Sequence, residues 1–366
     1  MPPAGVKYQR ATEGHLSILR ESIGSAAQKK LSLTALTDPR SFHGVLNASL
    51  VRQAAEAIIS AHGFKGMRAS IIQIGLSAGN NSGKEPQPIW AIELIPRRGP
   101  LLQPYVFTSG HHDCEYAGPQ SALHLLNVVM DQLSNKNPKF QRMFGRHPMV
   151  FIPLANPDGA LLEESDEFTG ARFAADPLDE IGFVKDPNIY ETYLEKKTGE
   201  RALIWPEAAQ IQSYLQGFIS SYGTPRLTVD FHETSAYTGK IDIDNRRLNR
   251  YVYIAMKIAN MVQNRDPALK RVISVDVDFV ALSEAINKAV QLYGPSISDE
   301  LIIGRPERHF KHTGQCFMGI CEWLKSRGAE NSYIIETPNV EHTFHVGDRV
   351  MLAMVAMEEI LSEVKF

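Results

Sequence analysis

The spacing of apolar residues changes along the chain, from helical in the first 69 residues to an alternation of short and long apolar segments afterwards. Short β-branched and aromatic runs predict strands, and longer stretches with apolar positions three and four residues apart predict helices. The predicted strands are 70–75, 89–96, 105–108, 149–153, 226–231, 272–277 and 333–336, and the predicted helices are 121–133, 206–221, 248–264, 279–292 and 347–363. This alternation indicates an α/β fold, with a mixed, mostly parallel central sheet and helices on both faces.

The amino-terminal part of the chain has helical spacing at 15–23 and 50–62. Asn47, just before the second of these segments, is typical of a helix cap. We therefore expect residues 1–69 to form a helical lobe packed on a catalytic domain of residues 70–366. The same segment could instead form a wall of the active-site mouth or a contact between subunits, and the oligomeric state does not follow from the sequence.

Composition excludes several classes of partner. The 366 residues carry a net charge of −3 with mixed signs, so we expect neither nucleic acid nor an anionic membrane as a partner. Three cysteines cannot form a disulfide framework, and their odd number fits a reducing compartment. No signal peptide is visible, and no apolar run approaches the roughly 20 residues that span a membrane, so we expect a cytoplasmic protein.

Imidazoles and carboxylates gather at the ends of two predicted strands. His112 and Glu115 follow strand 105–108, and His232 follows strand 226–231. In an α/β sheet, ligands bind at the carboxyl ends of the strands. Zinc accepts imidazole nitrogen and carboxylate oxygen, and a catalytic zinc site uses three protein ligands plus a water. The sequence therefore predicts one zinc ion, bound by His112, Glu115 and His232.

Further carboxylates near these strand ends would support the chemistry. Asp230 or Glu233 could fix the tautomer of a metal-bound imidazole, and the sequence leaves that choice open. Glu336 ends the last predicted strand, where it could take a proton from a metal-bound water and pass it to a leaving nitrogen. We therefore expect Glu336 to be a general base.

Four motifs follow one another along the chain: Gly-His-His-Asp-Cys-Glu at 110–115, Asn-Pro-Asp-Gly at 156–159, Asp-Phe-His-Glu at 230–233 and Ile-Glu at 335–336. Their order, over roughly residues 70–360, resembles that of the zinc carboxypeptidase family. That family has Gly-x-His-x-x-Glu, then Asn-Pro-Asp-Gly, then a lone strand-end His and a late Glu. The resemblance implies a carboxypeptidase-like fold and the same three zinc ligands, with His111 as a neighbour. It also implies that Arg172 polarises the scissile carbonyl, and that Glu336 is the catalytic base.

The departures from the family concern substrate recognition. Residues 185–188 stand where family exopeptidases carry an Asn-Arg pair that clamps the terminal carboxylate, and Gly314 stands in place of a substrate-capping tyrosine. Arginine suits carboxylates, so Arg246 and Arg247 could bind an anionic substrate instead. Arg305 and Arg308 are further candidates, and all four arginines could equally pair with neighbouring acidic residues.

The function that we expect is that of a hydrolase, a metalloprotease of the carboxypeptidase type acting on a peptide or isopeptide bond. Its substrate would be a peptide or a small amide. One alternative is a deacylase of N-acyl amino acids, similar to succinylglutamate desuccinylase and aspartoacylase. The missing clamp keeps this alternative open. The Asn-Pro-Asp-Gly motif favours the peptidase. A second alternative is a non-catalytic peptide-binding module, for which Glu336 would have no purpose.

Overall fold

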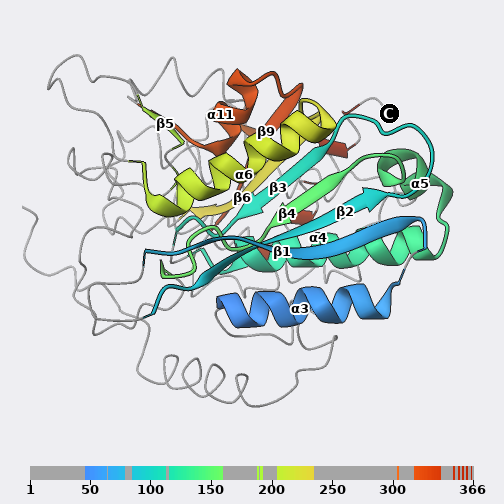
Figure 1. Ribbon diagram of the computed structural model, residues 1–366, viewed down its shortest axis with the longest axis horizontal. Coiled ribbons are helices and arrows are strands. Elements are labelled where there is room, and N and C mark those ends of the chain that lie inside the picture. Colours follow the sequence, from blue (N-terminus) through green and yellow to red (C-terminus); the bar gives the residue numbers. More distant parts are fainter. Residues whose placement is uncertain are drawn as a thin grey trace, which may run out of the picture.

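A twisted sheet forms the centre of the molecule, as the computed structural model shows (Figure 1). The structure describes residues 46–63, 65–78, 85–112, 115–159, 188, 190–192, 204–234, 303–304, 317–338, 349–350, 353–354, 357, 360–361 and 364. Within them the sheet has seven strands in the order β1-β2-β4-β3-β6-β9-β7. Their bounds are β1 Met67–Leu76, β2 Pro88–Pro96, β3 Tyr105–Ser109, β4 Met149–Ile152, β6 Leu227–Thr234, β7 Ile303–Gly304 and β9 Asn331–Pro338.

The sheet is mixed and mostly parallel, as predicted. Strands β4, β3, β6 and β9 pair in parallel, whereas β2 and β7 run against their neighbours. Six of the seven predicted strands are confirmed, and the seventh, 272–277, lies outside the described residues. The sequence did not predict β7 or the small sheet of β5 (Glu191–Thr192) and β8 (Phe317–Met318). Strands of two residues are too short to show a period.

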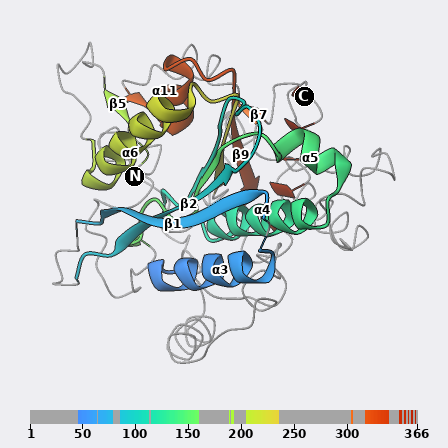
Figure 2. The same cartoon turned by 45° about the vertical axis from the view of Figure 1, so that its right-hand side comes forward.

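Helices cover both faces of the sheet (Figure 2). On one face lie α3 (Ala48–Ala61), α4 (Ala117–Ser134) and α5 (Pro138–Phe144), and on the other lie α6 (Pro206–Tyr222) and α11 (Ile320–Ser326). Asn47 caps α3 as predicted, since its side chain accepts the Leu50 N–H at 2.9 Å. Predicted helices 50–62, 121–133 and 206–221 are confirmed, as is 347–363 where it is described, whereas 15–23, 248–264 and 279–292 lie outside the described residues.

Two buried cores lie on the two faces of the sheet, because side chains alternate along each strand. On β3, Tyr105 and Phe107 face the core under α3 and α4, whereas Val106 faces the core under α6 and α11. Phe107 stacks on Phe151 of β4 with ring centroids 4.7 Å apart. The central strands are therefore buried on both faces, and only their ends are available for chemistry.

Residues 46–63, at the end of the predicted amino-terminal lobe, pack on the same core as α4. Leu50, Ala54 and Ile58 of α3 belong to the core that also contains Ile92 of β2. Because residues 1–45 lie outside the described part, the division of the chain at residue 69 stays a prediction. In the part of the chain that the structure describes, no helix has the length and apolar character needed to cross a membrane.

Candidate metal centre

The turn between β3 and α4, residues 110–116, begins with a backbone conformation that favours glycine. We call it the ligand turn; the structure describes it except for residues 113 and 114. Gly110 has φ of +67°, and a Cβ there would lie 2.9 Å from Leu154 Cδ1. Asn156 holds the turn from the side, because its backbone N–H donates to the Gly110 carbonyl and its Nδ2 donates to the His111 carbonyl. The two histidines of the turn are thereby held at the end of the sheet.

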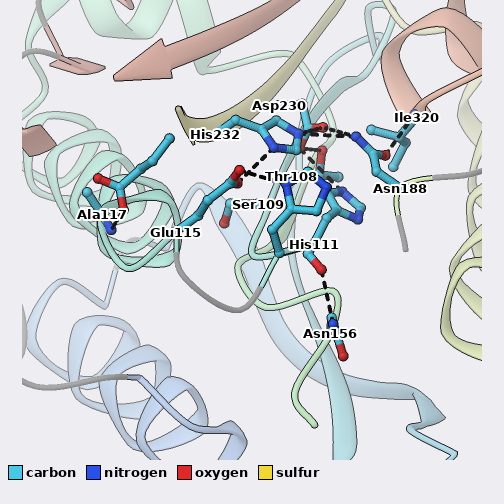
Figure 3. Close-up of polar contacts among 12 residues, drawn as sticks. Thr108, Ser109, His111, Glu115, Ala117, Asn156, Asn188, Asp230, His232 and Ile320 are labelled. Atoms are coloured by element: carbon cyan, nitrogen blue, oxygen red, sulfur yellow. Dashed lines mark hydrogen bonds and ion pairs between the residues drawn. The ribbon is translucent and has the colours of Figure 1, made fainter. Parts of the chain in front are cut away.

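The structure brings the three predicted ligands together. His112 Nδ1 lies 2.6 Å from one oxygen of Glu115, and His232 Nδ1 lies 2.8 Å from the other oxygen. One potential ligand atom from each of the three lies within 4.8 Å of the other two. The parallel pairing of β3 with β6 causes this meeting, since Ser109 and Phe231 are partners and the ligands follow them. Figure 3 shows Glu115 and His232 pointing toward each other.

The second ring nitrogen of His232 is bound to Asp230. His232 Nε2 lies 2.5 Å from Asp230 Oδ2, and the two residues share one face of β6 because they are two positions apart. Asp230 also accepts the Thr108 hydroxyl at 2.7 Å and the Asn188 Nδ2 at 3.3 Å (Figure 3). A proton held on Nε2 would leave Nδ1 as the nitrogen that could bind a metal ion, and carboxylates commonly orient metal-bound histidines in this way.

The orientation of Asn188 is determined by α11. The Ile320 N–H donates to Asn188 Oδ1 at 3.1 Å, so the amide must present its Nδ2 to Asp230. Asn188 belongs to residues 185–188, the segment in which the Asn-Arg clamp of the carboxypeptidase family is missing. No feature of the sequence indicated that Asn188 would lie next to His232. Thr108 was also not identified from the sequence as a partner of Asp230. Thr108 lies one residue before the end of β3, and the pairing of β3 with β6 places it opposite Asp230.

A second group of possible ligands, His111, Asp230 and His232, overlaps the first. His111 Nε2 lies 3.4 Å from Asp230 Oδ1, and both side chains are completely buried. Asp230 already accepts hydrogen bonds from three neighbours, so its oxygens are engaged as acceptors. His112, Glu115 and His232 form the better candidate metal site, because the two Nδ1 atoms converge on a carboxylate. His112 also reaches the surface, with 11 % of its side chain exposed.

Burial and charge oppose each other in this cluster. Burial raises the pKa of Glu115, but the positive charges of His112 and His232 outweigh it and lower the pKa to about 2. Burial likewise raises the pKa of Asp230, and the charges of His232 and His111 bring it well below its ordinary value. Burial lowers the pKa of His232, whereas Asp230 and Glu115 raise it well above the usual range. The two carboxylates are therefore held in their ionised form beside the histidines.

Glu233, the other carboxylate considered as a partner of His232, has a different role. Its side chain lies on the opposite face of β6, where it accepts the Ala117 N–H at 2.8 Å and pairs with Arg349 at 2.6 Å. The choice left open by the sequence is thus decided for Asp230. The alternation of side chains along a strand was the signal that would have decided it.

The remaining predicted site residues are only partly described. The backbone of Glu336 pairs with that of His232 in the parallel ladder between β6 and β9. Residues 160–187, 235–302 and 305–316 lie outside the described residues. They contain Arg172, Arg246, Arg247, Arg305, Arg308 and Gly314. Their roles stay predictions, as does the assignment of the three ligands.

Comparison with solved structures identifies the fold. The structure of thrombin activatable fibrinolysis inhibitor (TAFI) is similar with a TM-score of 0.52 and 12 % identity, over 95 % of this chain and 80 % of that one. Carboxypeptidase A from Helicoverpa armigera is similar with a TM-score of 0.50 and 13 % identity, over 97 % of this chain and 82 % of that one. The sequence matches no protein-family model and no curated protein. The chain therefore has a zinc carboxypeptidase-like fold.

Proposed function

We propose that this chain is a zinc-dependent amide hydrolase that cleaves a peptide or isopeptide bond. The observation that carries the proposal is the convergence of His112 Nδ1, His232 Nδ1 and the Glu115 carboxylate at the strand ends of a carboxypeptidase-like fold. The similarity to carboxypeptidase A concerns the fold, and the donor set of this chain supports the chemistry.

The donor set fits zinc. Two imidazole nitrogens and one carboxylate can form a catalytic zinc site with a fourth position for water. The Asp230 carboxylate, in contact with His232 Nε2, would hold that imidazole in the tautomer that leaves Nδ1 for the metal. When bound, zinc polarises a carbonyl and lowers the pKa of water toward neutrality. The buried carboxylates of Glu115 and Asp230 provide the negative charge that a divalent cation needs.

Glu336 would act as the general base. Neighbouring strands lie about 4.8 Å apart, so the pairing of Glu336 with His232 supports a glutamate close to the metal position. Glu336 would accept the proton of the attacking water and then donate it to the nitrogen of the departing amine. Arg172 would stabilise the oxyanion, and Arg246 and Arg247 would bind an anionic substrate group; these three assignments rest on the sequence.

The test combines zinc content with hydrolysis of a panel of short peptides and N-acyl amino acids. Glu336→Gln should keep its zinc and lose at least about 100-fold in kcat, because a general base contributes about 10²–10⁴-fold. The matched control is Glu330→Gln, the same substitution at an exposed position just before β9, which should retain full activity.

Each result has a definite consequence. Release of a terminal amino acid from peptides supports the peptidase, whereas cleavage of only N-acyl amino acids would assign the chain to the deacylases. Near wild-type turnover of Glu336→Gln would refute the general-base assignment. Bound zinc without turnover on any substrate would favour the binding module.

A further inference from the structure

A buried ion pair lies directly behind the metal centre and takes no part in the proposed chemistry. Glu233 follows His232 on β6 but projects from the opposite face, toward α4. Its carboxylate is completely buried and lies 2.6 Å from Arg349 Nη1, whose side chain is 3 % exposed. The pair joins two segments that are 116 positions apart in the sequence.

The second contact of Glu233 reaches the ligand turn. One of its oxygens accepts the backbone N–H of Ala117, at 2.8 Å. Ala117 is the first residue of α4, and it lies two positions after the predicted ligand Glu115. A carboxylate at a helix N-terminus binds a backbone N–H that the helix itself leaves unpaired.

Both ends of the ligand turn therefore rest on β6, the strand that carries His232. The beginning is attached through β3, where Ser109 pairs with Phe231. The end is attached through the contact between Ala117 and Glu233. The first turn of α4 also lies very close to the strand, because a Cβ at Gly118 would be 2.8 Å from the Phe231 carbonyl oxygen. The distance between His232 and Glu115 depends on these attachments.

We propose that Glu233 and Arg349 are positioning residues of the metal centre. Glu233 holds the end of the ligand turn against β6 through the Ala117 N–H, and Arg349 holds the Glu233 carboxylate in place. The carboxyl-terminal segment that carries Arg349 thereby contributes to metal affinity without contacting the metal. This inference rests on the proposed zinc site.

Two double variants separate positioning from stability. Glu233→Met/Arg349→Met removes the ion pair and the acceptor for Ala117, whereas Glu233→Gln/Arg349→Met removes the ion pair but keeps an acceptor oxygen. Neither variant leaves one charge of the pair buried without the other. Such an uncompensated charge would destabilise the fold most. Arg52→Met/Glu56→Met, in an exposed pair on α3, is the matched control.

The measurement is zinc affinity by competition with a chromogenic chelator, on protein whose fold is checked by circular dichroism. We expect about tenfold weaker zinc binding for the Met/Met variant, the lower end of the effect of residues that orient ligands. The Gln/Met variant should bind zinc about threefold more weakly than the wild type, because it keeps the acceptor for Ala117 but loses Arg349. The α3 control should bind zinc like the wild type. Equal affinity of both Glu233 variants, whether unchanged or reduced, would overturn the inference.

A second measurement needs no variant. Coupling is reciprocal, so zinc added to the wild type should slow hydrogen exchange of the amides of residues 349–354 if Arg349 is coupled to the site. Unchanged exchange there would overturn the inference while leaving the zinc site intact. Absence of zinc binding by the wild type would refute the proposed function itself, so the two failures are distinguishable.

Discussion

Asp230→Asn tests the link between the buried carboxylate and the metal centre with almost no change of shape. The amide oxygen can still accept from His232 Nε2 and Asn188 Nδ2, and its NH₂ group can donate to the Thr108 oxygen. The substitution therefore removes the negative charge and retains the hydrogen bonds.

The expected magnitude follows from the hydrogen bond to His232. A bond to a charged group contributes about 1.5–3 kcal/mol and a neutral one about 0.5–1.5 kcal/mol, so the difference is about 1–1.5 kcal/mol. Since 1.4 kcal/mol corresponds to a factor of ten, zinc affinity should fall about tenfold. This agrees with the lower end of the 10–100-fold effect that residues behind metal ligands usually have.

The assay is a chelator competition titration at constant pH. Asp131→Asn is the matched control, because Asp131 lies 3.7 Å from His62 Nδ1 on the surface of α4, in an aspartate–histidine pair away from the site. The control should bind zinc like the wild type. If Asp230→Asn also bound zinc within twofold of the wild type, the carboxylate would not support His232 as a ligand.

Three further predictions concern the turn, the pH dependence and the metal. Gly110→Ala should lower the free energy of unfolding by about 2–5 kcal/mol in denaturant titrations, because a left-handed backbone costs about 1–2 kcal/mol and the contact with Leu154 adds about 1–3 kcal/mol. Gly99→Ala, with φ of +79° and open space, should show only the backbone cost. Burial lowers the pKa of His147 below its value of about 6.5 in the unfolded chain. Below pH 6.5 the unfolded chain therefore binds a proton here more readily than the folded one, and the free energy of unfolding should fall by up to about 1.4 kcal/mol per pH unit. His147→Gln should flatten that slope in urea titrations between pH 7.5 and 5, and an unchanged slope would contradict the assignment. Zinc at 100 times its Kd should stabilise the fold by about 2.7 kcal/mol, and a chelator should reverse the resulting rise in Tm.

The Gly110 and zinc predictions have clear contrary results. Equal losses of stability for Gly110→Ala and Gly99→Ala would mean that the contact with Leu154 relaxes without cost. A Tm that did not change with zinc or chelator, in protein shown to bind the ion, would mean that the unfolded chain binds it equally well.

Most of the described fold could be predicted from the sequence, because its elements are long and their apolar periods are regular. The two helices that were missed, α5 and α11, have seven residues each. The start of α5 carried a usable signal, since Asn137 caps it and Pro138 occupies its first turn. The start of α11 has no side-chain cap, and Gly319 before it offered no such signal.

The sequence by itself determined the α/β alternation and the candidate ligands at strand ends, because periodicity and residue type are local properties. Only the tertiary structure decided which groups meet. The pairing of β3 with β6 brings Glu115 to His232, and a hydrogen bond from the first residue of α11 orients Asn188 toward Asp230. The tertiary structure also distinguished Asp230 from Glu233, which lie on opposite faces of β6. Asp230 contacts His232, whereas Glu233 accepts the backbone N–H at the start of α4. Contacts between segments more than 100 residues apart depend on strand order and packing, which no local pattern encodes.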